Sequence, residues 1–172
     1  AVVFGLAYGR EAYSLSKEFK ISVAEAERYV DTFFEAIPQV VEWRAEIKEK
    51  VLHRSETLET PFGRRRRFWL ITQENQKDVL NEAYGFLPQS IASDLTMLSM
   101  LEMQRKFDDG TAEIKLPVHD SVLVECKAED AKVVAIQMRA IMESTAKTSF
   151  SDYVPFTADA EIGNSWGELQ NA

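Results

Sequence analysis

The stretch KLPVHDSVLVE, from Lys115 to Glu125, places a His-Asp pair between two runs of β-forming residues. Such runs around a short polar pair predict two strands joined by a tight turn, and we expect a buried hairpin with His119 and Asp120 at its tip. An ionisable pair is unusual at the tip of a buried hairpin, so its role has to be explained. Asp commonly stabilises turns, so a structural role for Asp120 is one reading and a functional role is the other.

Helical patterns precede this hairpin. Apolar residues recur at helical spacing over residues 11–43, and SVAE (22–25) is a capping box that predicts the end of one helix near Lys20 and the start of another at Ser22. Pro38 is expected to end that second helix, and residues 39–52 predict a third. The N-terminal part of the chain is therefore predicted to be helical.

The composition then changes. In residues 56–72, ETLETPFGRRRRFWLIT, a Pro-Phe-Gly turn predicts a hairpin or a loop that ends in an extended segment. Helical spacing returns over residues 76–106, where Gly85 and Pro88 are expected to break the pattern into two helices. After the hairpin, a helix is predicted from Glu129 to about Ala146, followed by the extended stretch VPFTADAEIG. Helices first, then strands with interleaved helices, predict an α+β fold with a helical lobe on an antiparallel sheet.

The composition fits one well-cored domain or two small lobes that share a core. The chain has 172 residues, of which 45% are hydrophobic, and no apolar run approaches the roughly 18 residues that span a bilayer. The single cysteine, Cys126, excludes an internal disulfide and indicates a reducing compartment. We expect Cys126 to be a half-buried residue at the end of a strand and not a nucleophile.

The net charge is −8, which by itself argues against a nucleic-acid partner because phosphate binding depends on Lys and Arg. The charge is unevenly distributed, however, since Arg64, Arg65, Arg66 and Arg67 directly follow Gly63. An acidic protein can bind phosphate through one local basic element, so the total charge does not exclude nucleic acid.

The chain begins without a methionine and inside a helical pattern, VVFGLAYG (2–9), with no capping residue before it. We expect it to be a piece of something longer. A shortened chain, a processed product and one half of a split protein would each give this pattern, and the sequence does not choose among them.

Short motifs follow one another along the chain: FGLAYG (4–9), GRRR (63–66), PQSIASD (88–94), VHDS (118–121) and IGNSW (162–166). Each motif is weak alone. Their order, over about Val2 to Glu168, resembles the C-terminal third of family A DNA polymerases, the DNA polymerase I-like enzymes of bacteria, phages and organelles.

The resemblance implies an incomplete polymerase right-hand fold within the α+β class. Residues 1–54 would be the fingers helices, beginning with a remnant of the nucleotide-facing helix. Residues 55–172 would be the palm segment, with a DNA-binding loop, a metal-binding hairpin and a C-terminal strand. The implied partners are primer-template DNA and a dNTP, in the cytoplasm of a bacterial or phage-infected cell.

In this family, FGxxYG lies on the helix that closes over the incoming nucleotide. By resemblance, Phe4 would face the base and sugar of the nucleotide, and Tyr8 would lie beside the templating base. Residues four apart share a helical face, and Gly5 and Gly9 let other groups approach the backbone closely. Without the resemblance, both aromatics would be read as ordinary core residues.

The VHDS hairpin resembles the palm motif of the family. There Asp120 would be one of two aspartates that hold two catalytic Mg²⁺ ions, and His119 would approach the primer terminus. Mg²⁺ prefers hard oxygen ligands, and in two-metal phosphoryl transfer the ions stabilise both the attacking and the leaving oxygen. On the His-Asp pair alone we favour a turn-capping role for Asp120; with the other motifs we favour the metal.

The arginine run matches the GRRR element of the family, which implies that Arg64 and Arg65 contact phosphates of primer or template. Its alternative is a solvated surface run. Gln89 matches a family glutamine near the minor groove of the primer-template duplex. Its alternative is a residue beside a helix N-cap.

Several positions depart from the family pattern: the usual Asn before Phe4 is Val3, and the Gln before Val-His-Asp is Pro117. The acidic residue that often follows His-Asp is Ser121, as in some phage-like members. Gly85 and Asn81 stand where an Asn and an Arg are usual. These departures put minor-groove contacts and fidelity in doubt, but not the fold.

The family's other metal-binding aspartate lies in an upstream palm motif, and nothing in this sequence resembles that motif. We therefore expect the C-terminal part of a DNA-directed DNA polymerase that is inactive as an isolated chain and needs an upstream segment or a second chain. The alternative is a catalytically inactive, polymerase-derived DNA-binding module. A small Mg²⁺-dependent nuclease or phosphotransferase using Asp120 is a third reading, disfavoured because no second acidic cluster has a matching spacing.

Overall fold

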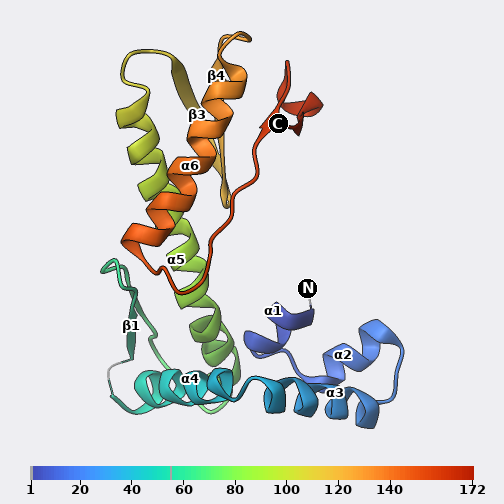
Figure 1. The fold of residues 1–172 in the computed structure, drawn as a ribbon. Helices are drawn as coiled ribbons and strands as arrows, with labels where there is room; N and C mark the ends of the chain where they lie inside the picture. The colour runs from blue at the N-terminus through green and yellow to red at the C-terminus, as the bar shows by residue number, and fades with distance from the viewer. Residues whose placement is uncertain (1, 55) are drawn as a thin grey trace. The chain divides into compact units, whose positions relative to one another are not determined.

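The computed structural model describes residues 2–54 and 56–172, apart from the side chains of residues 2 and 4. The chain divides into two compact units, Ala1–Ser90 and Ile91–Ala172, and each has its own hydrophobic core. α-Helices and antiparallel strand pairs make up the described chain, which confirms the predicted α+β class (Figure 1). Within the described residues, no helix is both long enough and apolar enough to cross a membrane.

The first unit begins with four helices whose boundaries follow from local sequence. They are α1 (Val2–Ala7), α2 (Ala12–Phe19), α3 (Val23–Ala36) and α4 (Pro38–Glu49). Lys20 takes a left-handed conformation that ends α2, and the Ser22 hydroxyl accepts a hydrogen bond from the Glu25 amide at 3.2 Å to start α3. Pro38 occupies the first turn of α4, where its missing N–H is tolerated. These predicted boundaries are confirmed.

A short hairpin packs on the end of these helices. A π-helical turn (Lys50–Arg54) extends α4, and β1 (Thr57–Glu59) pairs antiparallel with β2 (Arg65–Arg67). Leu58, which is 2% exposed, fixes β1 in the core. Phe68 does the same directly after β2. The core residues of this unit are Ile47, Val51, Leu58, Phe68, Ala83, Tyr84 and Phe86.

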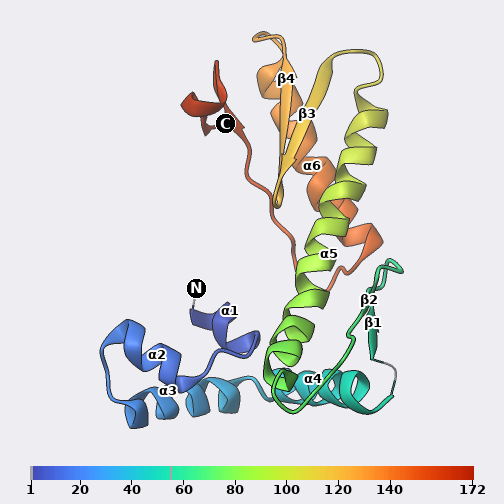
Figure 2. The same ribbon diagram turned by 180° about the vertical axis from the view of Figure 1, so that it is seen from behind.

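The second unit contains the hairpin that carries His119 and Asp120. β3 (Ala112–Val118) pairs antiparallel with β4 (Ser121–Cys126), and α6 (Ala131–Ser149) follows (Figure 2). Residues of α5 (Gln76–Lys106), the hairpin and α6 share one core, built on Met103, Phe107, Ala112 and Val134. The chain ends in β5 (Glu161–Ile162), a 3-10 turn (Trp166–Glu168) and β6 (Gln170–Asn171), and β5 pairs with β6.

The predicted break at Gly85 and Pro88 is wrong, because α5 runs without interruption from Gln76 to Lys106. A proline inside a helix removes one backbone hydrogen bond and costs about 3 kcal/mol. Burial on both sides offsets that cost: Tyr84 and Phe86 precede Pro88 in the first core, and Met103 follows it in the second. Tertiary packing thus overrides the local preference.

One further expectation is corrected. The β3–β4 hairpin is half-buried and not buried, since exposed and partly covered residues alternate along β3. The stretch after α6 contains a short strand, Glu161–Ile162, among the described residues. Cys126, by contrast, is the half-buried last residue of β4, as predicted.

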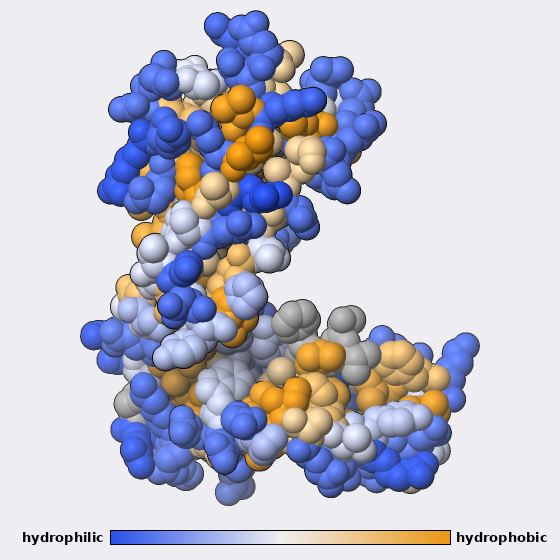
Figure 3. Space-filling model, viewed as in Figure 1, coloured by the Kyte–Doolittle hydropathy of each residue, from blue (hydrophilic) through white to orange (hydrophobic). Residues whose placement is uncertain are grey.

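Apolar side chains gather at the surface over α6 on the face shown in Figure 3. Val133 and Ile136 of this helix are 57% and 67% exposed. These residues stand one helical turn apart and so lie on the same side of the helix. An exposed apolar face of this kind is typical of a surface that another segment or protein covers.

Candidate metal-binding hairpin and nucleic-acid contacts

The turn between β3 and β4 holds the predicted metal ligand at a fixed point. His119 and Asp120 form this two-residue turn, closed by the Val118–Ser121 pair and by a 2.8 Å hydrogen bond from the Ser121 hydroxyl to the Val118 carbonyl. His119 has a φ of 57°, in the left-handed region. Both turn residues are exposed. The hairpin therefore presents the Asp120 carboxylate from a rigid two-stranded support.

The donor set at this tip is small. Among the described residues, no group of three or more His, Cys, Asp or Glu side chains lies close enough together to hold a metal ion. Mg²⁺ requires about six oxygen ligands in near-octahedral geometry. The described residues of this chain therefore do not form a two-ion site by themselves. Asp120 fits one ligand position of such a site.

The β1–β2 hairpin places the arginine run at the surface. The Thr60 amide donates to the Arg64 carbonyl at 2.9 Å and the Arg64 amide donates to the Thr60 hydroxyl at 3.2 Å, which closes the turn through Gly63. Arg65 pairs with Glu59 through Nε and Oε2 at 2.7 Å. All four arginine side chains are exposed. Their positions suit contacts with a phosphate backbone.

Arg66 and Arg67 both lie over aromatic rings, and Arg66 also forms an ion pair. Arg66 pairs with Glu82 of α5 at 2.5 Å and lies 5.4 Å from the Phe68 ring centroid. Arg67 lies 4.9 Å from the centroid of Trp69, which is 67% exposed. Exposed ion pairs contribute about 0–1 kcal/mol, so a phosphate can replace these carboxylates at small cost.

The predicted nucleotide-facing residues begin the first unit. Phe4 lies in α1, but its side chain is outside the described part of the chain. α1 ends at Ala7, so Tyr8 lies in the following turn and does not continue the helical face of Phe4. The physical reason is the C-terminal motif of α1: the Arg10 amide donates to the Gly5 carbonyl at 2.8 Å, with Gly9 at φ 100°.

Gly9 also brings the Tyr8 turn against α5. A Cβ atom at Gly9 would lie 1.9 Å from Oδ1 of Asn81, so only glycine permits this approach. Gln89 is exposed further along α5, and a Cβ atom at Gly85 would lie 3.6 Å from its Nε2. The close backbone approach predicted for Gly9 is thus present, and its partner is a residue of α5.

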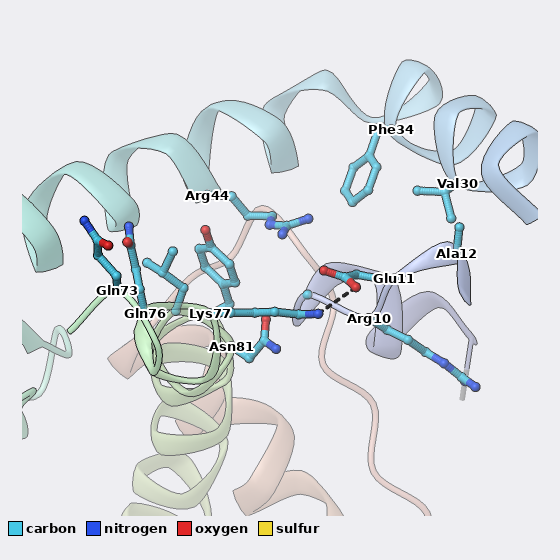
Figure 4. Close-up of a pocket in the computed structure, with 13 residues that line it drawn as sticks. Arg10, Glu11, Ala12, Val30, Phe34, Arg44, Gln73, Gln76, Lys77 and Asn81 are labelled. Atoms are coloured by element: carbon cyan, nitrogen blue, oxygen red, sulfur yellow. Dashed lines mark ion pairs between the residues drawn. The ribbon is translucent and has the colours of Figure 1, made fainter. Parts of the chain in front are cut away.

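A cleft of about 480 Å³ lies within the first unit and was not predicted from the sequence (Figure 4). Its walls come from the turn after α1, from α3 and α4, and from the start of α5. Arg44 of α4 points into it, beside Phe34 and Tyr84. These residues belong to three separate helices, and no motif or spacing in the sequence links them.

Comparison with known proteins gives consistent matches. The sequence model of DNA polymerase family A matches residues 1–168. DNA polymerase I of Treponema pallidum (strain Nichols) is 31% identical over 171 residues, which cover 96% of this chain and 17% of that protein. The thermostable DNA polymerase I of Thermus aquaticus is 30% identical over 168 residues, 95% of this chain and 19% of that protein. The chain thus spans less than a fifth of the curated relatives it matches first.

A solved structure has the same fold over most of the chain. The POL domain of Pol1 from M. smegmatis, in complex with DNA primer-template and dNTP, superposes with a TM-score of 0.74. The match covers 83% of this chain and 26% of that domain at 24% sequence identity. At this identity the likeness concerns the fold.

Proposed function

This chain belongs to DNA polymerase family A, and we propose that it is the C-terminal part of a DNA-directed DNA polymerase that adds dNTPs to a primer 3′-hydroxyl. The observation that carries the proposal is the family match over residues 1–168, which includes every motif of the predicted site. The substrates of the proposed reaction are primer-template DNA and a dNTP. Both are present in the complex of the M. smegmatis domain.

The proposed roles follow the motifs. Phe4 faces the incoming nucleotide and Tyr8 the templating base, while Arg64 and Arg65 contact backbone phosphates and Gln89 the minor groove. In this assignment residues 1–54 are the fingers helices and residues 55–172 the palm segment. The exposed positions of Arg64, Arg65 and Gln89 leave all three side chains accessible to DNA.

Asp120 contributes one carboxylate to a site for two Mg²⁺ ions, and His119 lies next to the primer terminus in this proposal. When bound, such ions supply the charge stabilisation of phosphoryl transfer. The contribution of the chain itself is positional: the β3–β4 turn holds the Asp120 carboxylate at the end of a two-stranded support. A carboxylate held by such a hairpin needs little reorganisation when a metal binds.

The proposal includes an upstream segment or second chain that completes the metal site. Two observations support it. Among the described residues, no group of three or more His, Cys, Asp or Glu side chains could hold a metal ion, and α6 exposes Val133 and Ile136 on one face. An upstream palm segment would supply the further aspartate and cover apolar surface. We therefore expect the isolated chain not to extend primers. A phage-like origin and a cytoplasmic location are part of the same proposal.

A second candidate is a catalytically inactive, polymerase-derived DNA-binding module. The structure favours it because the arginine hairpin is anchored within this chain, through Leu58, Phe68 and the closed Thr60–Arg64 turn. DNA binding without chemistry needs no metal. Pro117 in place of the usual Gln beside the metal motif points the same way.

A chimera separates the two candidates. Residues 1–168 of this chain would replace the matching C-terminal segment of the Thermus aquaticus polymerase, and primer extension would be measured with Mg²⁺. The proposed polymerase function predicts extension by the chimera and none by the isolated chain. A folded chimera that binds primer-template but does not extend it would instead favour the DNA-binding module. Extension by the isolated chain, lost on Asp120→Asn, would show that no further segment is needed.

A further inference from the structure

The cleft of the first unit has an excess of positive charge. Its described lining includes the cations Arg10, Arg44 and Lys77 against one carboxylate, Glu11. Neutral amide groups of Gln73, Gln76 and Asn81 complete the polar part of the wall. A cleft lined in this way attracts anions even in a protein whose net charge is −8.

Two of these cations already have acidic partners. Lys77 pairs with Glu11 at 2.6 Å between Nζ and Oε2, as the dashed line in Figure 4 shows. Arg10 pairs with Glu18 and donates to the Ser14 hydroxyl at 3.2 Å. In Figure 4 the Arg10 side chain also points away from the other cations. Neither residue therefore offers an unneutralised charge to the cleft.

Arg44 differs from both. Its guanidinium carbon lies 4.5 Å from the Tyr84 ring centroid and 5.2 Å from that of Phe34. Among the described residues it has no hydrogen-bond or ion-pair partner. Aromatic rings attract a cation through their faces but leave the N–H donors in the guanidinium plane unused. Arg44 is thus a positioned, half-buried cation whose donors have no partner within the described part of the chain.

A partly desolvated cation without a counterion is unfavourable, and a bound anion relieves that cost. The fork of a guanidinium matches the oxygens of a phosphate, and stacking on rings limits the rotamers that must be ordered on binding. Both ring partners come from outside α4, since Phe34 lies in the last turn of α3 and Tyr84 lies in α5. The packing of the helices therefore fixes the Arg44 guanidinium in position before a phosphate binds.

We propose that Arg44, held between Phe34 and Tyr84, binds a phosphate group in this cleft. The inference rests on the proposed function, because nucleic acid and nucleotides are the phosphate compounds that a polymerase segment meets. Two sources share this chemistry: a phosphodiester of a DNA strand, and a free nucleotide or pyrophosphate. The family resemblance assigns no role to Arg44, and the arginine run of β2 is a separate element.

The first test is binding of a fluorescein-labelled single-stranded oligonucleotide to the full chain, followed by fluorescence anisotropy. Arg44→Gln should weaken binding about tenfold at low salt and make the salt dependence shallower by about 0.7 in the log–log slope. Arg28→Gln is the matched control, because Arg28 is exposed on α3 outside the cleft and loses the same charge. Arg44→Lys keeps the charge but not the fork, and should give an intermediate loss.

The second test distinguishes the sources and does not depend on a variant that folds. The oligonucleotide and, in a separate sample, inorganic pyrophosphate would be titrated into the ¹⁵N-labelled wild-type chain while the Arg44 Nε–H resonance is observed by NMR. A shift with the oligonucleotide assigns the site to a DNA strand, and a shift with pyrophosphate alone assigns it to a free nucleotide. A resonance that moves with neither overturns the phosphate site.

The outcomes also separate this inference from the proposed function. If wild type and Arg44→Gln bind the oligonucleotide equally, Arg65→Gln binds it more weakly and pyrophosphate does not shift the Arg44 resonance, the proposed DNA binding is supported and the Arg44 phosphate site is overturned. If the wild-type chain binds no oligonucleotide but pyrophosphate shifts the Arg44 resonance, the phosphate site stands and the DNA contacts proposed for this chain fail.

Discussion

The two main hairpins of this chain carry opposite charges and differ in how far the chain itself supports them. The β1–β2 hairpin presents arginines, and Arg65 and Arg66 already pair with Glu59 and Glu82. The β3–β4 hairpin presents Asp120, which has no ion-pair or hydrogen-bond partner among the described residues. Two arginines of the basic hairpin are thus already paired with carboxylates, whereas the Asp120 carboxylate at the acidic tip has no partner among the described residues.

This difference indicates which function each hairpin can perform alone. A phosphate contact needs one cation at the surface, and exchanging an exposed carboxylate for a phosphate costs little. A Mg²⁺ ion needs several hard oxygen ligands that converge on one point. DNA binding can therefore belong to the isolated chain, whereas under our proposal the metal-dependent chemistry draws on ligands from another segment.

The largest effect on activity is expected at Asp120, at the tip of the β3–β4 hairpin. In the chimera with the Thermus aquaticus polymerase, Asp120→Asn should lower primer extension by more than about a hundredfold. This loss is larger than the loss typical of residues that orient a metal ligand without binding the metal themselves. Asp108→Asn, the same change in an exposed turn, is the control and should leave the rate unchanged. Equal rates for Asp120→Asn and wild type would remove Asp120 from the metal site.

The second largest effect is expected on stability, because the buried residues that anchor the two hairpins should contribute differently to the free energy of unfolding. Leu58→Ala empties a position that is 2% exposed and should lower the free energy of unfolding by roughly 2–5 kcal/mol. Val122→Ala changes a partly buried residue of β4 and should cost about 1 kcal/mol. Urea unfolding followed by circular dichroism gives both values. Similar losses would mean that the second hairpin is as well anchored as the first.

The ion pair of the basic hairpin provides a smaller and reciprocal test. Arg65→Gln should weaken binding of duplex DNA and reduce the salt slope by about 0.9, because one phosphate contact is lost. Glu59→Gln should instead strengthen binding, because it removes the carboxylate that competes with phosphate for Arg65. Both variants should change the free energy of unfolding by less than about 1 kcal/mol. Weaker binding in Glu59→Gln would show that the pair positions Arg65 and does not compete with DNA.

The smallest effect concerns the base of the β3–β4 hairpin. Burial, with Asp130 and Glu125 nearby, raises the pKa of the Cys126 thiol. The folded chain therefore keeps this proton at a pH where the unfolded chain releases it, and the free energy of unfolding falls as pH rises above the ordinary thiol pKa. Iodoacetamide alkylation of the folded chain should show its midpoint at higher pH than alkylation in urea. A midpoint at or below the urea value would contradict this.

Local sequence signals predicted most of the elements. The capping residues Ser22 and Pro38 set helix boundaries because their effects act within one turn. The turn at His119 and Asp120 followed from the β-forming runs on either side. The prediction failed at Pro88, where packing on both sides holds α5 together, and at the end of α1, where the motif that closes on Gly9 leaves Tyr8 in a turn.

The sequence by itself determined the family, the α+β class and the candidate residues, because motifs and periodicity are written in chain order. Only the tertiary structure decided that Arg44 stacks on Phe34 and Tyr84 in a cleft, and that the arginines of β2 meet Glu59 and Glu82. The physical reason is that these contacts join residues from different elements. Their existence depends on how helices and strands pack, which no single stretch of sequence encodes.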